Sequence, residues 1–482
     1  MNKYLYKITF LLLTSFTVVS CSDFLDVAPQ DKILEDQAYS SEAGVQNVHN
    51  GLYLQLATNN LYGRQLTMDA VEILGQQYNM SGSHVKNKIS TYSYEETLSK
   101  NTFAGIWQSA FTTVLSANKF LESIDEHPEV ISAEKAAILK GEAIAIRAMI
   151  HFDMLRMYGP IYKVAPADPS IPYYDAAVTV NKPLLPAQDV IAKIIADLDA
   201  AIVLLAKDPI LTTGRYIGST EFDSNPYYSV NRGQRMNILA VKCLKARVLL
   251  YAGDKTGAYA VATEVINFVK GQPVITWTPF LEATNTSNPD RIFSSENFFA
   301  LSDQTLYIEQ KALFDSSLDD FNIYAPMLSR INAVFESNDN DYRSLPSWKI
   351  PISGGKTQKT FFKYEDVTDK TKLFRFQIPM FKLSELYLIA AETAPVPADG
   401  IAFLNTLRFN RGLTNLAATA VLATEITKEY RKEFIGEGQL FFYYKRINST
   451  AIPNGNASSG NVTMNAVKYV VPLPDSEINF QN

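Results

Sequence analysis

The feature that most constrains the fold of this chain is a helical pattern that recurs in pairs. The clearest stretch covers residues 134–158, where small and apolar residues repeat at helical spacing until Gly159-Pro160 ends the pattern. The other helical stretches are residues 36–58, 103–126, 187–207, 236–251, 256–270, 383–391 and 400–410. Because a helical hairpin cannot bury both of its faces alone, such hairpins must stack to make a core. The pattern therefore predicts an all-α fold built of tetratricopeptide-like helical hairpins.

Residues 271–377 depart from this pattern. Phe, Tyr and Trp alternate there with Asn, Asp, Ser and Pro, and the helical periodicity is short or absent. We expect a large irregular insertion with a few short strands, for example at residues 360–364. Irregular segments carried on a rigid scaffold commonly hold binding residues, so a ligand site is expected in this region.

The N-terminus predicts export from the cytoplasm. Lys3 and Lys7 are followed by an apolar run at residues 8–19, which is shorter than the roughly 20 residues of a membrane-spanning helix and is typical of a signal peptide. Small residues then lead to Cys21, an arrangement that resembles the lipobox of bacterial lipoproteins, in which the cysteine is diacylated. We expect residues 1–20 to be removed, 21–36 to form a lipidated, extended leader, and 37–482 to form the folded domain. The alternative is a plain secretory signal with an incidental cysteine.

Composition argues against several function classes. The formal net charge is -6, and loss of the two lysines with the signal makes the mature part more acidic. Because phosphate binding needs a basic surface, we expect no nucleic acid partner. Cys243 is the only cysteine besides Cys21, so no disulfide framework is expected. The four histidines lack metal-ligand spacing, and we expect neither a metal nor a cofactor.

Several separated blocks of sequence carry a family resemblance. They are residues 21–26, 141–159, 246–254, 378–392, 404–413, 431–446 and 472–478. In this order they resemble the SusD/RagB family, the surface glycan- and nutrient-binding lipoproteins of Bacteroidetes, over nearly the whole chain. Two scaffold positions depart from the family: Lys382 stands where Arg is usual, and Phe442-Tyr443-Tyr444 stands where an aromatic-Asp pair often precedes the Lys-Arg motif.

The resemblance implies an outer-membrane position, held by the lipid on Cys21 and facing outside the cell. Family members capture oligosaccharides, or in some cases peptides, and pass them to a TonB-dependent, SusC-like β-barrel. Asp23 and Asp26 resemble the signal that sends such lipoproteins to the cell surface. We therefore expect a protein of glycan nutrient uptake, with a RagB-like, peptide-capturing protein of the same transport system as the alternative.

Candidate binding residues follow from the chemistry of sugars. An exposed aromatic ring can stack on the apolar face of a sugar, while polar side chains bind its hydroxyl groups. Residues 62–94 and 277–348 combine these side chains outside the helical pairs, and the family builds its binding face from the same two regions. We predict four stacking platforms and one hydroxyl partner, namely Tyr78, Tyr307, Tyr324 and Trp348, with Asp69. The alternative for each ring is buried packing, and Trp107, within a helical stretch, is expected in the core. If Trp348 is a platform, Trp348→Ala weakens binding and leaves the melting temperature nearly unchanged.

A lipid-anchored, glycan-processing enzyme is the alternative from another class. Glycoside hydrolysis needs two carboxylates about 5 to 9.5 Å apart. Glu385 and Glu392 share a helix face, but a rise of 1.5 Å per residue places them about 10.5 Å apart along the axis. We expect these two to pair with arginine or backbone groups. The acidic pair Asp339 and Asp341 is expected to be solvated loop charge. We therefore predict no catalytic residues.

Overall fold

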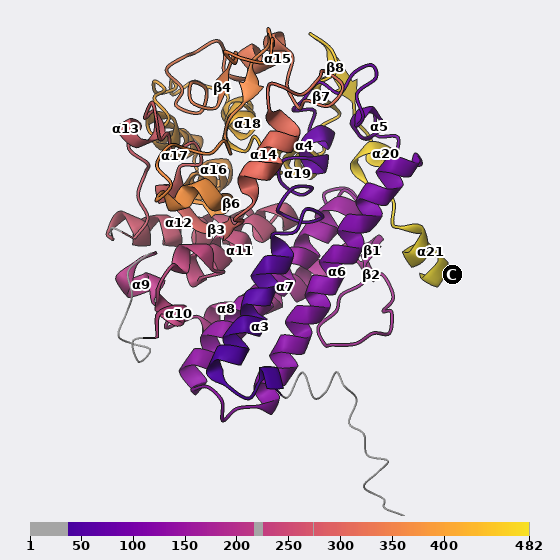
Figure 1. Ribbon diagram of the computed structural model, residues 1–482, viewed down its shortest axis with the longest axis vertical. Coiled ribbons are helices and arrows are strands. Elements are labelled where there is room, and N and C mark those ends of the chain that lie inside the picture. Colours follow the sequence, from indigo (N-terminus) through magenta and orange to yellow (C-terminus); the bar gives the residue numbers. More distant parts are fainter. Residues whose placement is uncertain (1–36, 216–224, 273, 482) are drawn as a thin grey trace, which may run out of the picture.

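A computed structural model of the chain describes residues 37–215, 225–272 and 274–481 (Figure 1). The expected signal peptide, Cys21 and the leader lie outside the described residues. The described strands are short and pair only in twos, whereas helices run through the whole described chain. The predicted all-α fold is confirmed. No helix in the described ranges combines the length and the apolar character that crossing a bilayer requires.

The helical hairpins form the scaffold. Its main helices are α3 (Glu42–Leu56), α6 (Thr97–Glu126), α7 (Ala133–Tyr158), α8 (Ala187–Leu204), α11 (Ile238–Ala252), α12 (Lys255–Lys270), α16 (Leu383–Thr393) and α17 (Pro397–Phe409). From α6 to α17, each of these helices packs on the next, and α3 packs on α6 and α7. The predicted helices are therefore present, with ends that differ by a few residues for most of them.

Helix α7 lies at the centre of the scaffold, and its sequence explains why. Ser132 caps its N-terminus by accepting a hydrogen bond from the backbone N–H of Lys135. Buried residues lie all around the helix rather than on one stripe, because neighbours cover several of its faces. A Cβ on Gly141 would lie 2.7 Å from Cγ of Leu205, so the missing side chain lets the end of α8 approach closely.

The predicted insertion begins after α12. It contains α13 (Phe280–Ala283), η3 (Ser294–Glu296), β3 (Asn297–Ser302), α14 (Leu306–Phe314), α15 (Leu328–Val334), β4 (Trp348–Lys349), β5 (Thr360–Phe361) and η4 (Leu373–Phe376), and it ends at β6 (Gln377–Lys382). Strand β3 pairs antiparallel with β6, so the two ends of the insertion meet beside the scaffold. Of the strand expected at residues 360–364, only Thr360–Phe361 is formed, paired with β4.

The remaining elements connect and cover these parts. They are α4 (Ala70–Leu74), α5 (Asn87–Ser90), β1 (Pro169–Ile171), β2 (Leu185–Pro186), α9 (Ile210–Thr213), α10 (Pro226–Ser229), η2 (Arg232–Gln234), α18 (Leu422–Glu433), α19 (Leu440–Ile447), β7 (Ala451–Pro453), β8 (Asn461–Thr463), α20 (Ala466–Tyr469) and α21 (Asp475–Gln481). In Figure 1 the long helices α3, α6 and α7 extend to the lower end of the molecule, and α14, α15 and β4 lie in its upper part.

Buried ion pairs join the insertion to the C-terminal helices. Arg411, fully buried, pairs with Glu296 at 2.6 Å and with Glu433 at 2.7 Å. Arg343 pairs with Glu433 at 2.9 Å and with Asp341 at 2.7 Å. Asp341 is 0% exposed, so the expectation of solvated loop charge is wrong for this residue. The reason is its neighbour Arg343, which brings the carboxylate into the buried network.

The scaffold carboxylates Glu385 and Glu392 form ion pairs with arginine residues. Glu385 accepts hydrogen bonds from Arg247 at 2.5 and 2.7 Å, and Glu392 accepts from Arg446 at 2.6 and 2.7 Å. The predicted pairing of both residues with arginine is confirmed. Such bidentate pairs fix both side chains in one geometry.

Candidate functional site

Four of the five predicted binding residues lie together, but inside the protein. Asp69, Tyr78, Tyr324 and Trp348 are 0%, 1%, 2% and 3% exposed. The rings of Tyr78 and Tyr324 pack with centroids 5.5 Å apart, and Trp348 stacks on Phe361 at 4.5 Å. A buried ring has no free face for a sugar, so the expectation that these three rings are exposed platforms is not met. They pack the insertion against residues 62–94.

The Asp69 carboxylate is also occupied by the protein. Its Oδ1 accepts a hydrogen bond from the Tyr324 hydroxyl at 2.9 Å, and its Oδ2 accepts from Nε of Arg64 at 2.9 Å. In this arrangement Asp69 ties the loop before α4 to the insertion instead of facing a ligand.

Tyr307 is the predicted platform that reaches the surface. It lies on α14, is 38% exposed, and lines a hollow of about 340 Å³ together with Lys349 and Phe362. The Lys349 ammonium lies 4.1 Å from the centre of the Phe362 ring. The hollow therefore presents both an aromatic surface and charge, and the role of Tyr307 as a stacking platform stays a prediction.

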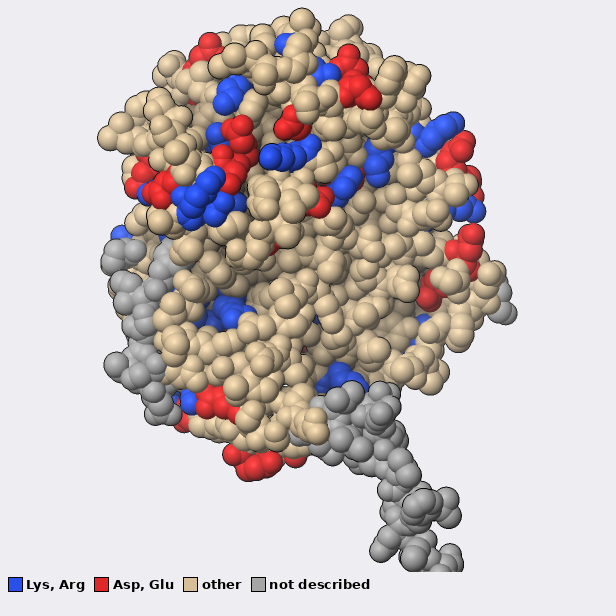
Figure 2. All heavy atoms as spheres, viewed as in Figure 1, with Lys and Arg blue, Asp and Glu red and all other residues tan. Residues whose placement is uncertain are grey.

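A larger hollow, of about 950 Å³, lies between the C-terminal end of α3, the segment around α10 and η2, and the turn from β3 to α14. It neighbours the Tyr307 hollow, because Thr305 lines one and Tyr307 the other. Figure 2 shows that this face of the molecule is hollowed, with basic side chains at the bottom of a depression. Most of the residues that line it are polar, including Gln46, Asn50, Asn225, Asn231, Gln234 and Gln304.

Arg235 stands between two aromatic rings of this hollow. Its guanidinium carbon lies 4.8 Å from the ring centre of Tyr53 and 4.7 Å from that of Tyr227. Its Nη2 donates a hydrogen bond to Oδ1 of Asn50 at 2.7 Å. Because the guanidinium is held between two rings and by the hydrogen bond to Asn50, a ligand that it binds does not have to order it first.

The floor beneath Arg235 is a buried charged network. Arg232, three residues earlier, pairs with Glu142 at 2.5 Å and with Asp208 at 2.7 Å. Burial raises the pKa of Glu142, but the Arg232 guanidinium, the neighbouring His49 and Arg235, and the hydrogen bond from Tyr53 together outweigh burial and lower this pKa to about 2. Burial lowers the pKa of His49, beside Glu142, to about 3. The charges at the floor are therefore fixed at neutral pH, and the segment that carries Arg235 is anchored.

Asp303 supplies an acceptor on the opposite wall. Its Oδ1 accepts hydrogen bonds from the backbone N–H and the hydroxyl of Thr305, both at 2.7 Å. Its Oδ2 is buried and has no hydrogen-bond partner among the residues that the structure describes. A buried polar atom without a partner is costly, and a ligand hydroxyl would remove that cost. Arg235 and Asp303 thus give the hollow a donor and an acceptor beside the half-buried ring of Tyr227.

The comparisons with known proteins agree on one family. A family model described as "Starch-binding associating with outer membrane", of the SusD-like type, matches residues 23–214. A SusD-like protein of Formosa agariphila is 28% identical over 157 residues, which are 30% of this chain and 29% of that protein. A SusD-like protein of Bacteroides ovatus is 25% identical over 205 residues, covering 41% of this chain and 34% of that protein. Each match thus spans about a third of the relative.

Solved structures of the same kind share the fold. A SusD superfamily protein from Bacteroides thetaiotaomicron has a TM-score of 0.70 at 19% identity, covering 91% of this chain and 98% of that chain. Surface glycan-binding protein A from Bacteroides uniformis has a TM-score of 0.69 at 16% identity, with the same coverage. The chain therefore shares the fold of these proteins, and residues 23–214 match the SusD-like family model.

Sequence reasoning missed the main hollow of this chain. Tyr227 and Arg235 lie in neither of the two segments that were expected to build the binding face, and Asp303 was not selected within the second. One signal was available, because residues 225–235 concentrate Asn, Tyr, Gln and Arg between two helical stretches. This segment meets the start of α14 because β3, which leads into α14, packs on η2, a contact that the sequence pattern did not predict.

Two further side chains of the helical scaffold are buried. His151 is 0% exposed, with Nδ1 2.9 Å from the carbonyl oxygen of Arg147 and Nε2 accepting from the backbone N–H of Tyr174 at 3.0 Å. Trp107 is 7% exposed within α6. The expected core position of Trp107 is confirmed. Among the described residues, no group of His, Cys, Asp or Glu side chains could hold a metal ion.

Proposed function

We propose that this chain is a surface-exposed, lipid-anchored outer-membrane protein that binds glycan nutrients and delivers them to a TonB-dependent, SusC-like transporter. The observation that carries the proposal is the open hollow lined by Arg235, Tyr227 and Asp303, whose buried Oδ2 has no hydrogen-bond partner among the described residues. The family description "Starch-binding associating with outer membrane" and the glycan-binding protein of the same fold support it.

The chemistry of the hollow suits an oligosaccharide. At about 950 Å³, its size lies at the upper end of small-molecule sites. A sugar offers an apolar face to an aromatic ring and hydroxyl groups that both donate and accept, which matches Tyr227, Arg235, Asp303 and the surrounding amides.

The same lining favours capture over hydrolysis. Among the described residues that line the hollow, Asp303 is the only carboxylate. A glycosidase of the usual kind needs a second one on the other side of the scissile bond. We therefore propose that the protein holds its cargo without breaking it.

The anchor and the partner complete the proposal. Removal of residues 1–20 would leave Cys21 to be lipidated, and residues 21–36 would link the anchor to the domain at residues 37–482. Two acyl chains hold a protein stably on a membrane. Incorporation of labelled palmitate into the wild type but not into Cys21→Ser, and co-purification with a large β-barrel, would support both parts. Absence of label in the wild type would contradict the anchor.

Affinity electrophoresis in gels that contain single polysaccharides tests the binding site. We expect one or more glycans to retard the wild type without release of new reducing ends. Arg235→Ala and Asp303→Asn should each weaken binding by about 10-fold or more, the equivalent of one charge-assisted hydrogen bond of about 1.5 to 3 kcal/mol. Asp339→Asn, an exposed change elsewhere in the insertion, is the matched control and should bind normally. Equal retardation of all variants would remove this hollow from the site, and released sugar would contradict capture.

A further inference from the structure

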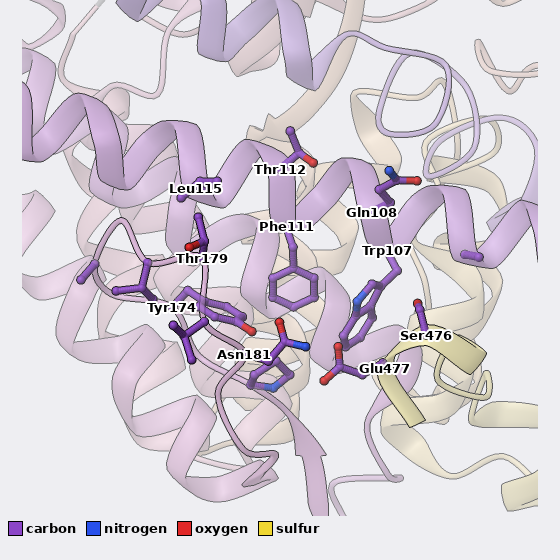
Figure 3. A pocket seen from close by; sticks show the side chains of 15 residues that line it. Trp107, Gln108, Phe111, Thr112, Leu115, Tyr174, Thr179, Asn181, Ser476 and Glu477 are labelled. Atoms are coloured by element: carbon purple, nitrogen blue, oxygen red, sulfur yellow. The ribbon is translucent and has the colours of Figure 1, made fainter. Parts of the chain in front are cut away.

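A second pocket lies on other elements of the fold. It has a volume of about 580 Å³ and is formed by α6, the loop that follows β1, and α21 near the C-terminus (Figure 3). None of its lining residues lines the Arg235 hollow or the Tyr307 hollow. It therefore requires a separate explanation.

Three aromatic rings form one wall of this pocket. Trp107 and Phe111 lie one turn apart on α6 with centroids 4.5 Å apart, and Tyr174 follows on the loop with its ring 5.6 Å from Phe111. The planes of neighbouring rings are inclined by 53° and 72°, so the wall is angled rather than flat. Phe111 and Tyr174 are half-buried, which leaves parts of the rings accessible from the pocket.

A carboxylate without a cation lies beside these rings. Glu477, on α21, is only 7% exposed. It accepts a hydrogen bond from Nε2 of Gln481 at 2.8 Å, and within the described ranges it makes no ion pair. No Lys or Arg is present among the described residues that line the pocket. The Lys182 ammonium lies 5.7 Å from the centre of the Tyr174 ring, where it pairs with Asp175 at 2.6 Å. Figure 3 shows the Glu477 carboxylate and the Asn181 amide turned toward the space in front of Phe111 and Trp107.

Charge decides which ligand suits this arrangement. A buried carboxylate is costly unless an opposite charge accompanies it, and the faces of aromatic rings attract organic cations. An anionic ligand would be repelled, and a neutral ligand would leave the charge uncompensated. A protonated amine satisfies both the carboxylate and the rings. The polar rim at Gln108, Thr112 and Thr179 can then bind hydroxyl groups.

We propose that this pocket is a second binding site, specific for a saccharide that carries a protonated amine. The inference goes beyond the proposed function, because it rests on this pocket alone and requires nothing of the Arg235 hollow.

Isothermal titration of the full-length protein with the glucosamine dimer and with its N-acetylated dimer tests the proposal. Acetylation removes the positive charge and keeps the sugar rings. We expect the amine form to bind at least 10-fold more tightly. Equal affinity of the two dimers, or binding of neither, overturns the proposal. This test uses the wild-type protein and needs no variant.

Variants assign the binding to the pocket. Glu477→Gln keeps the shape of the side chain and should weaken binding of the glucosamine dimer at least 10-fold. The matched control is Asp475→Asn, an exposed carboxylate on the same helix, which should bind as the wild type does. An unchanged affinity in Glu477→Gln overturns the proposal, and melting temperatures verify that each variant is folded.

Two more measurements separate possible outcomes. Choline carries the charge without the sugar, so choline binding as tightly as the dimer would overturn the saccharide part of the proposal. Asp303→Asn should leave binding of the glucosamine dimer unchanged, and Glu477→Gln should leave polysaccharide retardation at the Arg235 hollow unchanged. Failure at one site is therefore distinguishable from failure at the other.

Discussion

Replacement of Trp348 by alanine should destabilise the protein. Trp348 is 3% exposed and stacks on Phe361 at a centroid distance of 4.5 Å and an angle of 28°. Phe361 in turn packs on Phe314 at 5.1 Å, so the indole is part of a continuous aromatic layer inside the insertion. Removing a buried Trp or Phe side chain costs about 3 to 5 kcal/mol, because apolar contacts are lost and a cavity remains.

The expected shift in melting temperature follows from the size of the chain. At about 2 cal/mol/K per residue, unfolding of the 482 residues has an entropy of about 1 kcal/mol/K. A loss of 3 to 5 kcal/mol therefore lowers the melting temperature by about 3 to 5 °C. Differential scanning calorimetry measures this shift, with Tyr307→Ala, at an exposed ring, as the control that should move by about 1 °C or less.

The result separates packing from binding. The platform hypothesis for Trp348 expects an unchanged melting temperature and weaker glycan binding. The structure predicts the reverse, namely a lower melting temperature and normal affinity for the fraction that stays folded. An unchanged melting temperature in Trp348→Ala would refute the packing argument.

Three further predictions concern stability. Burial lowers the pKa of both His49 and His151 to about 3. Between pH 6.5 and 3 the unfolded state therefore binds more protons than the folded state. The free energy of unfolding should fall as the pH falls through this window, by up to about 2.7 kcal/mol per pH unit for the two histidines together. Urea midpoints across this range measure the effect, and His49→Gln should reduce the slope. Arg411→Ala leaves Glu296 and Glu433 without their shared partner and should lower the free energy of unfolding, measured in urea, by about 3 to 5 kcal/mol. The control Lys370→Ala, at an exposed ion pair, should lower it by less than about 1 kcal/mol. Gly141→Ala should cost about 1 to 3 kcal/mol of stability, because the new Cβ would meet Leu205. Gly51→Ala, at a position in α3 with open space around it, should stabilise the protein by about 0.5 to 1 kcal/mol. Equal effects of the two substitutions would contradict the close approach at Gly141.

The sequence by itself determined the helical scaffold. The period of apolar and small residues is a local property, so residues 134–158 predicted α7 nearly to the residue, and the loss of that period after α12 placed the insertion. The separated motif blocks likewise indicated the SusD-like resemblance, which the comparisons support.

Only the tertiary structure decided which side chains face a ligand. An aromatic residue in an irregular segment has no periodicity that assigns it to one side, so Tyr78, Tyr324 and Trp348 could equally have been surface or core. Their burial follows from contacts between residues 62–94 and the insertion, more than 200 positions apart in the case of Asp69 and Tyr324. In the same way, Arg235 and Asp303 meet around one hollow because β3 packs on η2 and on α3. Contacts at such sequence distances are set by packing of the whole fold, which a local pattern does not encode.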